Sequence, residues 1–270
     1  MKILQEQLKQ LHKIELKALI KFDKICQNHH ITYTLAGGTL LGAIRHKGFI
    51  PWDDDVDVML LRSEFEKLRK IDTQEWGEDY FYQSYKTDHH YMYTYDKLRV
   101  NGTYFGEEAL ENTGIKNNGV FIDIFPADEV PLGKKGELQI LKFKILRLIF
   151  MAKYININHR HGIEKKTAKV LRVLFKNISL DKLYHENDAL IQKYDGIGTN
   201  LYRTFDSFGV KKETYEKRYL IEVKETNFEG YPLKISKYYN EILSEYYGNY
   251  MKLPSKSEQV NKHEVVGLTL

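Results

Sequence analysis

This chain of 270 residues contains one cysteine, Cys26, and only five prolines. A single thiol excludes an internal disulfide framework and a zinc site built from cysteines. No apolar run approaches the roughly 20 residues that a membrane-spanning helix needs. The N-terminus turns polar at Gln5, so the apolar region of a signal peptide does not form there. We therefore expect a cytoplasmic protein, which suits a reduced thiol.

A large excess of charge of one sign is also absent. The chain has 41 Lys and Arg and 37 Asp and Glu, which gives a net charge of +4. This balance excludes a strongly basic nucleic-acid binder, and we expect no nucleic-acid partner. Hydrophobic residues make up 42% and charged residues 29% of the chain, as in globular rather than disordered proteins. Aromatic residues reach 13%, which suits either an aromatic core or a surface that binds carbohydrate or choline.

Hydrophobic periodicity and turn residues divide the chain into an ordered series of helices and strands. Expected helices cover 3–28, 40–46, 63–70, much of 134–220, and 237–247. Expected strands cover 31–36, 55–61, parts of 80–100 and 120–125, with a hairpin over 228–235. The residues after Pro254 are polar, and we expect a mobile tail there.

Two basic helical segments bear on contact with a membrane. In 138–155 the basic side chains scatter around the helix, which predicts a mostly buried helix with exposed ends. In 164–178 the basic residues Lys165, Lys169, Arg172 and Lys176 form one stripe opposite an apolar side. That stripe is either a solvated helix face or a surface that docks on an anionic membrane or polymer.

Four aspartates crowd the stretch from Pro51 to Met59, at positions 53, 54, 55 and 57. Alternate side chains of a strand share a face, so Asp53, Asp55 and Asp57 are expected to point the same way. Their mutual repulsion raises their pKa values unless a divalent cation lies between them. Oxygen ligands favour Mg²⁺ or Mn²⁺. The alternative is an acidic surface loop, but aspartate is depleted in strands, and apolar residues follow directly.

Asp123 is the candidate for a third ligand. It lies within the otherwise apolar strand 119–126, where a lone carboxylate is costly to bury unless it is paired or bound to metal. With Asp55 and Asp57 it would complete a site for two metal ions. The alternative is a structural aspartate that accepts hydrogen bonds from backbone amides.

Gly37 and Gly38 join a strand to the N-terminus of a helix, and Thr39 follows them. Exposed amides and the helix dipole favour an anion there, and glycine lets the backbone approach a phosphate closely. A glycine pair alone is weak evidence, but an Asp-x-Asp strand comes next in the chain. The combination predicts a phosphate-bearing donor and its metal at one place. Lys97 and Arg99, at alternate positions of one strand, share a face and are expected either to neutralise charge or to form a surface ion pair.

Several blocks together resemble the LicD family: 35–57, 120–126, Lys97 to Arg99 with Thr103, and Tyr247 to Met251 with Pro254. The resemblance implies an α+β, nucleotidyltransferase-like core, a small mixed sheet flanked by helices, with a helical embellishment. We expect the catalytic core in 1–133, the helical region in 134–225, and a C-terminal hairpin, helix and tail in 226–270 that pack on the core. The ending Asn261 to His263 matches the family only loosely, and no role is assigned to His263.

The resemblance further implies transfer of phosphocholine, or a related phospho-alcohol, from a CDP-linked donor to a sugar hydroxyl of a cell-surface glycan such as teichoic acid, lipopolysaccharide or capsule. CMP would be released. Carried over by position, Asp55, Asp57 and Asp123 match the catalytic and metal residues, with two Mg²⁺ or Mn²⁺ ions, and Gly37 and Gly38 the phosphate residues.

On this hypothesis Thr39, Lys97 and Arg99 assist in binding the donor, and the glycan acceptor is lipid-linked. The protein would then be cytoplasmic and peripheral at the inner membrane face through 164–178. Three other functions stay open: a nucleotidyltransferase that acts on an NTP, a metal-dependent glycosyltransferase, and a non-catalytic module of glycan assembly. A choline headgroup would need an aromatic cage, and no spacing singles out one of the tyrosines at 82, 85, 91, 93 and 95.

Overall fold

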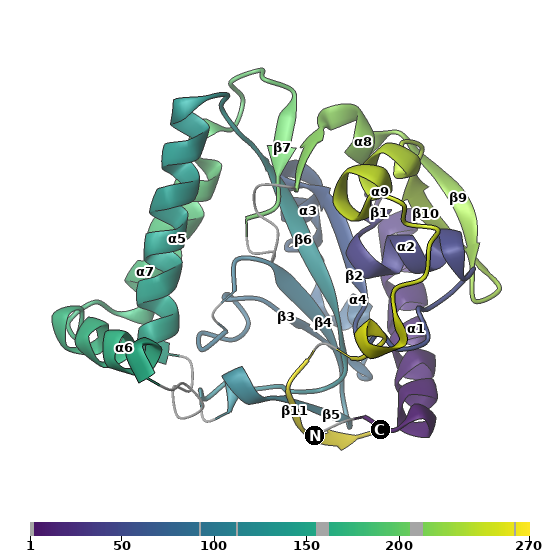
Figure 1. The fold of residues 1–270 in the computed structure, drawn as a ribbon, viewed down its shortest axis with the longest axis horizontal. Helices are drawn as coiled ribbons and strands as arrows, with labels where there is room; N and C mark the ends of the chain where they lie inside the picture. The colour runs from purple at the N-terminus through teal and green to yellow at the C-terminus, as the bar shows by residue number, and fades with distance from the viewer. Residues whose placement is uncertain (1–2, 92, 112, 155–161, 206–212, 262) are drawn as a thin grey trace.

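A computed structural model describes residues 3–91, 93–111, 113–154, 162–205, 213–261 and 263–270. A twisted mixed sheet runs through the centre of the molecule (Figure 1). Its main strands lie in the order β1 (Thr34–Leu35), β2 (Asp57–Leu61), β6 (Phe121–Glu129), β4 (Asp96–Val100) and β3 (Tyr80–Gln83). β2 and β6 are parallel, and the other pairs in this sheet are antiparallel. The fold is therefore the expected α+β class.

β6 is the long central strand and serves two groups of neighbours. Residues 121–124 pair with β4 and residues 123–127 with β2, and the last residues, Asp128 and Glu129, pair with β7 (Leu201–Arg203). β8 (Thr214–Glu216) pairs in turn with β7. Burial on both faces explains why the strand is so apolar around Asp123.

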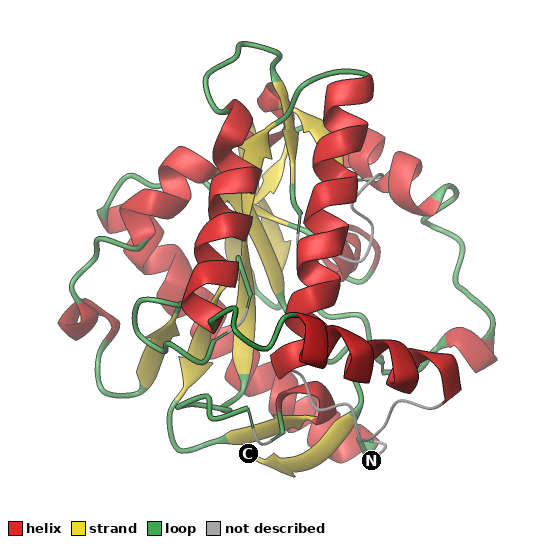
Figure 2. Ribbon diagram, turned by 90° about the vertical axis from the view of Figure 1, so that its left-hand side faces the viewer, coloured by secondary structure: helices red, strands yellow, loops and turns green. Residues whose placement is uncertain are grey.

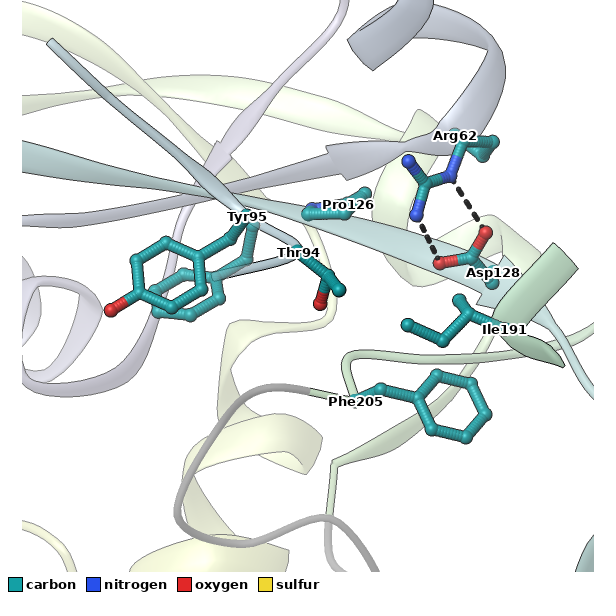
Figure 3. A pocket seen from close by; sticks show the side chains of 8 residues that line it. Arg62, Thr94, Tyr95, Pro126, Asp128, Ile191 and Phe205 are labelled. Atoms are coloured by element: carbon teal, nitrogen blue, oxygen red, sulfur yellow. Dashed lines mark hydrogen bonds and ion pairs between the residues drawn. The ribbon is translucent and has the colours of Figure 1, made fainter. Parts of the chain in front are cut away.

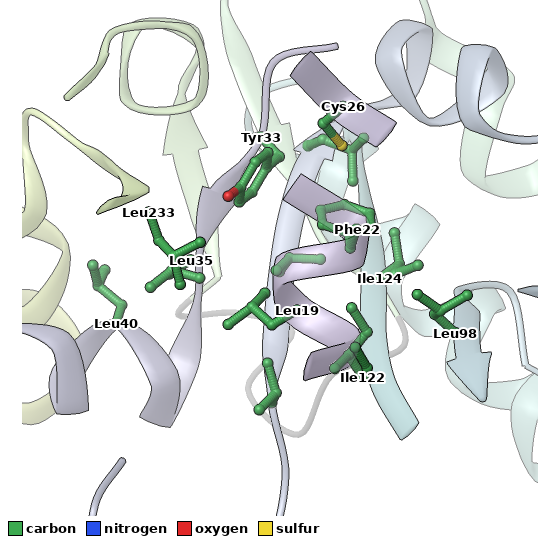
Figure 4. Packing of buried hydrophobic residues seen from close by; sticks show 14 of the residues in the cluster. Leu19, Phe22, Cys26, Tyr33, Leu35, Leu40, Leu98, Ile122, Ile124 and Leu233 are labelled. Atoms are coloured by element: carbon green, nitrogen blue, oxygen red, sulfur yellow. The ribbon is translucent and has the colours of Figure 1, made fainter. Parts of the chain in front are cut away.

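Helix α1 (Gln5–Asn28) covers one face of the sheet. Figure 4 shows Leu19, Phe22 and Cys26 of this helix packed against Leu35 and against Ile122 and Ile124 of β6, and all six side chains are almost fully buried. The helical spacing of the apolar positions on α1 produces this contact. On the same core lie α2 (Gly37–Arg45), the hairpin β9 (Val223–Phe228) and β10 (Tyr231–Ser236), and α9 (Tyr239–Tyr247).

A separate group of helices stands along the other edge of the molecule: α5 (Lys134–Tyr154), α6 (Gly162–Leu174) and α7 (Leu180–Ile191) (Figures 1 and 2). We call these three helices the arm. Ile149 and Phe150 of α5 pack on Tyr91, Tyr93 and Tyr95, and this cluster joins the arm to the sheet. No helix in the described ranges is both long and apolar enough to cross a membrane.

The remaining elements are short. They are α3 (Arg62–Leu68), α4 (Thr73–Trp76), α8 (Lys217–Ile221), the 3-10 turns η1 (Glu108–Leu110), η2 (Gln192–Tyr194) and η3 (Lys256–Glu258), and the paired strands β5 (Tyr104–Glu107) and β11 (Val265–Thr269).

Helices make up much of the region 134–220, as expected, and the short strands β7 and β8 lie there as well. Two local predictions were wrong. The alternating tyrosines at 91, 93 and 95 lie outside the strands, in a loop whose side chains are buried against the arm. The polar tail after Pro254 forms η3 and β11, because pairing with the edge of β5 supplies its backbone hydrogen bonds.

Candidate active site

The two glycines at the start of α2 lie directly against two carboxylates. A Cβ atom on Gly37 would come within 2.7 Å of Asp57 Oδ2, and one on Gly38 within 2.4 Å of Asp53 Oδ2. Gly37 also has a positive φ of 50°, which disfavours any other residue. The glycine pair is therefore required to let the acidic side chains approach the N-terminus of this helix, where the dipole favours negative charge.

Thr39 ties the same helix to the start of β2. Its Oγ1 accepts a hydrogen bond of 2.9 Å from the backbone N–H of Asp57, and the N–H of Ala36 donates to the Asp57 carbonyl at 3.0 Å. Thr39 is buried. Its observed contact holds Asp57 in place, whereas its expected contact with phosphate remains a prediction.

Asp57 and Asp123 lie side by side. They are register partners on the parallel strands β2 and β6, so their side chains emerge on the same face of the sheet. Burial raises the pKa of Asp57 well above its ordinary value, and the charges of Asp55, Asp123 and Asp53 raise it further. The sequence thus brings the three predicted carboxylates within electrostatic reach of one another.

Lys97 continues this row on β4, where it is the register partner of Asp123. Its Nζ lies 2.9 Å from Asp123 Oδ1 and 3.6 Å from Glu107 Oε2, and 3.3 Å from the centre of the Phe121 ring. Burial raises the pKa of Asp123 to about 6 although Lys97 opposes the shift. The side chain is fully buried, so the alternative of a surface ion pair is wrong for Lys97.

Arg99 shares the face of Lys97, as the alternation predicts, since both cations contact Phe121 and Glu107. Its Nε donates to Gln83 Oε1 and its Nη1 to the Gly119 carbonyl, both at 2.8 Å. The guanidinium is fully buried. These contacts fasten β4 to its neighbours, and a contact of Arg99 with the donor remains a prediction.

The aspartates that precede β2 form the tightest group. Within the described part of the chain, Asp53, Asp54 and Asp55 are the group of three that each place one carboxylate oxygen within 4.8 Å of the oxygens of the other two. The strand begins at Asp57, so residues 53–56 precede it instead of belonging to it, and Asp54 joins the group. The expected set of Asp55, Asp57 and Asp123 is less compact, since Lys97 holds Asp123.

The donor atoms fit a divalent cation. All are carboxylate oxygens, the ligands that Mg²⁺ and Mn²⁺ prefer. Asp53, Asp54 and Asp123 are buried, whereas Asp55 and Asp57 remain partly exposed and give access from solution. The raised pKa of Asp57 shows that its neighbours repel its ionised form, and a cation would relieve that repulsion.

Helix α1 contributes two site residues that the sequence analysis missed. Glu15 is buried, and no described residue forms a hydrogen bond with its Oε2. Burial raises its pKa well above the ordinary value, with Asp55, Asp54 and Asp53 adding to the shift. His12 Nε2 lies 2.8 Å from the carbonyl oxygen of Asp53. The sequence could have indicated Glu15, because this charged residue occupies an apolar position of the helical pattern.

His263 reaches the site from the C-terminal segment. Its Nδ1 lies 3.1 Å from Asp54 Oδ1, and its backbone N–H is 3.3 Å from Oδ2. This hydrogen bond and the nearby carboxylates raise the pKa of His263 to about 9 despite burial, so its ring is cationic at neutral pH. His263 also lines an open pocket of about 460 Å³, together with Glu108, Val260, Asn261, Glu264, Val265 and Val266. The loose match of the C-terminal block concealed this residue.

Most of the candidate tyrosines already have partners within the protein, whereas no described residue forms a hydrogen bond with the buried hydroxyl of Tyr91. Tyr82 donates a hydrogen bond to Asp96 at 2.9 Å, and Tyr85 bonds to Asp181. The rings of Tyr93 and Tyr95 lie 6.0 and 5.6 Å from Lys97 Nζ. The aromatic cluster beside Asp123 therefore surrounds a cation of the chain itself.

A second, small pocket lies at the far end of β6, and Figure 3 shows the side chains that line it. Arg62 and Asp128 point at each other there and form two bonds of 2.7 and 2.9 Å. The space between these side chains is too narrow for a water molecule. Because its charges neutralise each other, this place is a structural ion pair rather than a substrate site.

Comparison with known proteins agrees with the geometry. The model of the LicD/FKTN/FKRP nucleotidyltransferase domain matches residues 30–142, which include both glycines and the aspartates at 53, 54, 55, 57 and 123. The lipopolysaccharide cholinephosphotransferase LicD of Haemophilus influenzae is 31% identical over 256 residues, covering 92% of each chain. The chain belongs to the LicD family.

Two further relatives of this LicD-family chain match only short stretches. The uncharacterized protein RP689 of Rickettsia prowazekii is 40% identical over 48 residues, 18% of either chain. The uncharacterized protein RT0683 of Rickettsia typhi is 38% identical over 64 residues, 22% of this chain and 21% of its own. Likeness along nearly the whole chain is thus found with the Haemophilus protein, and the arm is included in it.

Proposed function

We propose that this protein transfers phosphocholine, or a closely related phospho-alcohol, from a CDP-linked donor to a sugar hydroxyl of a lipid-linked cell-surface glycan. The sugar oxygen forms a bond to the distal phosphorus of the donor, and CMP leaves. The observation that carries the proposal is the row of Asp57, Asp123 and Lys97 across three strands, in a chain related over 92% of its length to a lipopolysaccharide cholinephosphotransferase.

Two Mg²⁺ or Mn²⁺ ions would be held by Asp55, Asp57 and Asp123, with Asp53 close enough to Asp55 to share a ligand position. When bound, such ions supply the positive charge that stabilises a diphosphate and its leaving group. The carboxylates come from one turn and two adjacent strands, so the sheet keeps their backbone positions fixed.

The other residues act on these carboxylates. Lys97 favours the ionised form of Asp123, because its ammonium group lies 2.9 Å from the carboxylate in a buried place. Thr39 fixes the backbone of Asp57, and Gly37 and Gly38 leave room for the carboxylates at the helix N-terminus. Cationic His263 lies between Asp54 and the open pocket, so it can face an anionic donor there.

Product analysis tests this function. The purified protein is incubated with Mg²⁺, a panel of CDP-choline, CDP-glycerol and CDP-ribitol, and glycan acceptors, and the products are identified by mass spectrometry. We expect CMP and a phospho-alcohol-modified glycan with the intact protein and neither with Asp57→Asn. Release of pyrophosphate from an NTP would instead establish a nucleotidyltransferase.

A folded protein that binds Mg²⁺ but releases neither CMP nor pyrophosphate with any donor would contradict both enzymatic functions. It would leave the non-catalytic module of glycan assembly. Arg62→Lys, which alters the ion pair with Asp128 at the other end of β6, is the control for a general effect of substitution on the sheet.

A further inference from the structure

The charge of this protein is distributed very unevenly. Residues 132–178 contain 12 of the 41 Lys and Arg but only 2 of the 37 Asp and Glu, a local net charge of +10. The rest of the chain therefore has a net charge of −6. Helices α5 and α6 of the arm lie in this segment. The near-neutral total conceals a strongly basic structural unit.

Helix α5 also presents an apolar stripe to solvent. Leu138, Leu141, Ile145 and Leu148 are 45–55% exposed. At about 100° per residue they span an arc of about 80° along the outer side of the helix. Exposed lysines, Lys142 and Lys144, flank the stripe on its two sides. The prediction that this helix is mostly buried was therefore wrong, because only its other side packs on α7 and the sheet.

Helix α6 also presents exposed apolar side chains next to exposed lysines. Val170, Val173 and Leu174 are 56–70% exposed, and Lys166 and Lys169 are exposed beside them. The helix packs on α5 through Ala152 and Ala168, and Figure 2 shows it lying across the lower end of α5 on the near side.

The apolar surface is concentrated on this part of the molecule. With Leu132, the two helices hold 8 of the 17 exposed large hydrophobic side chains found among the described residues. Apolar patches of this kind usually mark a surface that binds something.

We propose that the outer face of α5 and α6 docks the protein on an anionic lipid surface. Apolar side chains bordered by lysines match the boundary between acyl chains and negatively charged headgroups. A second copy of the chain is a poorer partner, because a symmetric dimer would bring two identical basic faces together.

The proposed docking surface is linked to the candidate active site by packed side chains. The inner side of α5 packs through Ile149 and Phe150 on Tyr95, whose ring lies 5.6 Å from the Nζ of Lys97, the partner of Asp123. Docking would thus orient the carboxylates relative to a lipid-linked acceptor. This consequence rests on the proposed function, whereas the docking itself does not.

Flotation with lipid vesicles tests the docking without donor, metal or glycan. The full-length protein is mixed with vesicles of equimolar phosphatidylcholine and phosphatidylglycerol, and in parallel with phosphatidylcholine alone. We expect binding to the anionic vesicles, and a loss of that binding as ionic strength rises.

The variant Lys142→Glu/Lys144→Glu should weaken the partition coefficient at least about 25-fold, since each basic side chain near an anionic surface contributes about fivefold. Leu141→Ser/Ile145→Ser should weaken it at least about tenfold through the lost apolar contact. The matched control is Lys17→Glu/Lys24→Glu, the same change of charge on exposed positions of α1, which should bind as the unaltered protein does. Circular-dichroism melting verifies that each variant is folded.

Three results would overturn the proposal: no flotation of the intact protein, equal flotation of the arm variants, or an equal loss in the α1 control. Analytical sedimentation in the absence of lipid tests the alternative partner, a second copy of the chain. If the intact protein is a dimer and Leu141→Ser/Ile145→Ser is a monomer, the face serves self-association. The proposed function is tested separately, with a soluble acceptor, on which the arm variants should remain active.

Discussion

Replacing Asp57 by asparagine should make the protein more stable and inactive. Every neighbour that shifts the pKa of Asp57 raises it: burial first, then Asp55, Asp123 and Asp53. Asparagine keeps the shape of the side chain and removes the repelled charge. We expect a gain of about 1–2 kcal/mol in the free energy of unfolding without divalent metal, the usual size for relief at a functional site. For a chain of this length that raises Tm by about 2–8 °C.

Adding a divalent cation should reverse the order of stability, so that the intact protein becomes more stable than Asp57→Asn. A ligand at 100 times its Kd stabilises the folded state by about 2.7 kcal/mol, so Mg²⁺ should raise the Tm of the intact protein and raise that of Asp57→Asn much less. Differential scanning fluorimetry with EDTA and with Mg²⁺ measures both values of Tm.

The difference in stability between the two proteins should also depend on pH. The pKa of Asp57 in the folded protein lies above its unfolded value of 3.8, so this carboxyl group destabilises the folded protein increasingly as pH rises from 3.8. The advantage of Asp57→Asn should vanish below pH 3.8.

Asp128→Asn is the matched control. Asp128 is buried, forms two bonds with Arg62 and lies at the other end of β6. Its replacement removes the nearest carboxylate from a buried guanidinium, whose remaining ion pairs with Glu66 and Asp188 are longer, at 3.5 and 3.9 Å, and this should cost about 3–5 kcal/mol with or without Mg²⁺. A Tm of Asp57→Asn below that of the intact protein in EDTA, or an equal response of both to Mg²⁺, would refute the reasoning about this site.

Three further outcomes are expected. Gly38→Ala should fold, because Ala favours a helix, but its Cβ would displace the Asp53 carboxylate that lies 2.4 Å away, and calorimetry should show at least tenfold weaker Mg²⁺ binding. His263→Gln should remove the stabilisation that is complete below pH 6.5 and disappears as pH rises through about 9, which urea unfolding at several pH values detects. Tyr82→Phe should cost about 1.5–3 kcal/mol through the lost 2.9 Å bond to buried Asp96 and leave the rate of transfer unchanged.

Much of the site was predictable because its residues lie within a few positions of one another in sequence. Gly37 and Gly38 break the chain between a strand and a helix, and the aspartates follow at the start of the next strand. Asp123 was predictable for a different reason, since a lone carboxylate in an apolar strand needs a partner. The structure supplies Lys97 as that partner and Asp57 as its neighbour.

Contacts between distant segments were not predictable from a single sequence. Glu15 and His263 are 248 positions apart, yet both lie beside the aspartates that precede β2. The alternating tyrosines looked like a strand because period-two spacing also arises when a loop buries its aromatic rings against a helix. Helical periodicity likewise did not show which side of α5 is covered, because the amount of exposed apolar surface depends on where α6 and α7 pack.

Local pattern was enough for the class of fold and for the chemical identity of the acidic centre, since turns, strand propensity and the cost of buried charge act over a few neighbouring residues. Which charges meet, which cations oppose them and which apolar faces remain in water depended on the register of β2, β6 and β4 and on the packing of the arm. Those relations join residues far apart in the chain, and their energies arise only when the folded molecule brings them into contact.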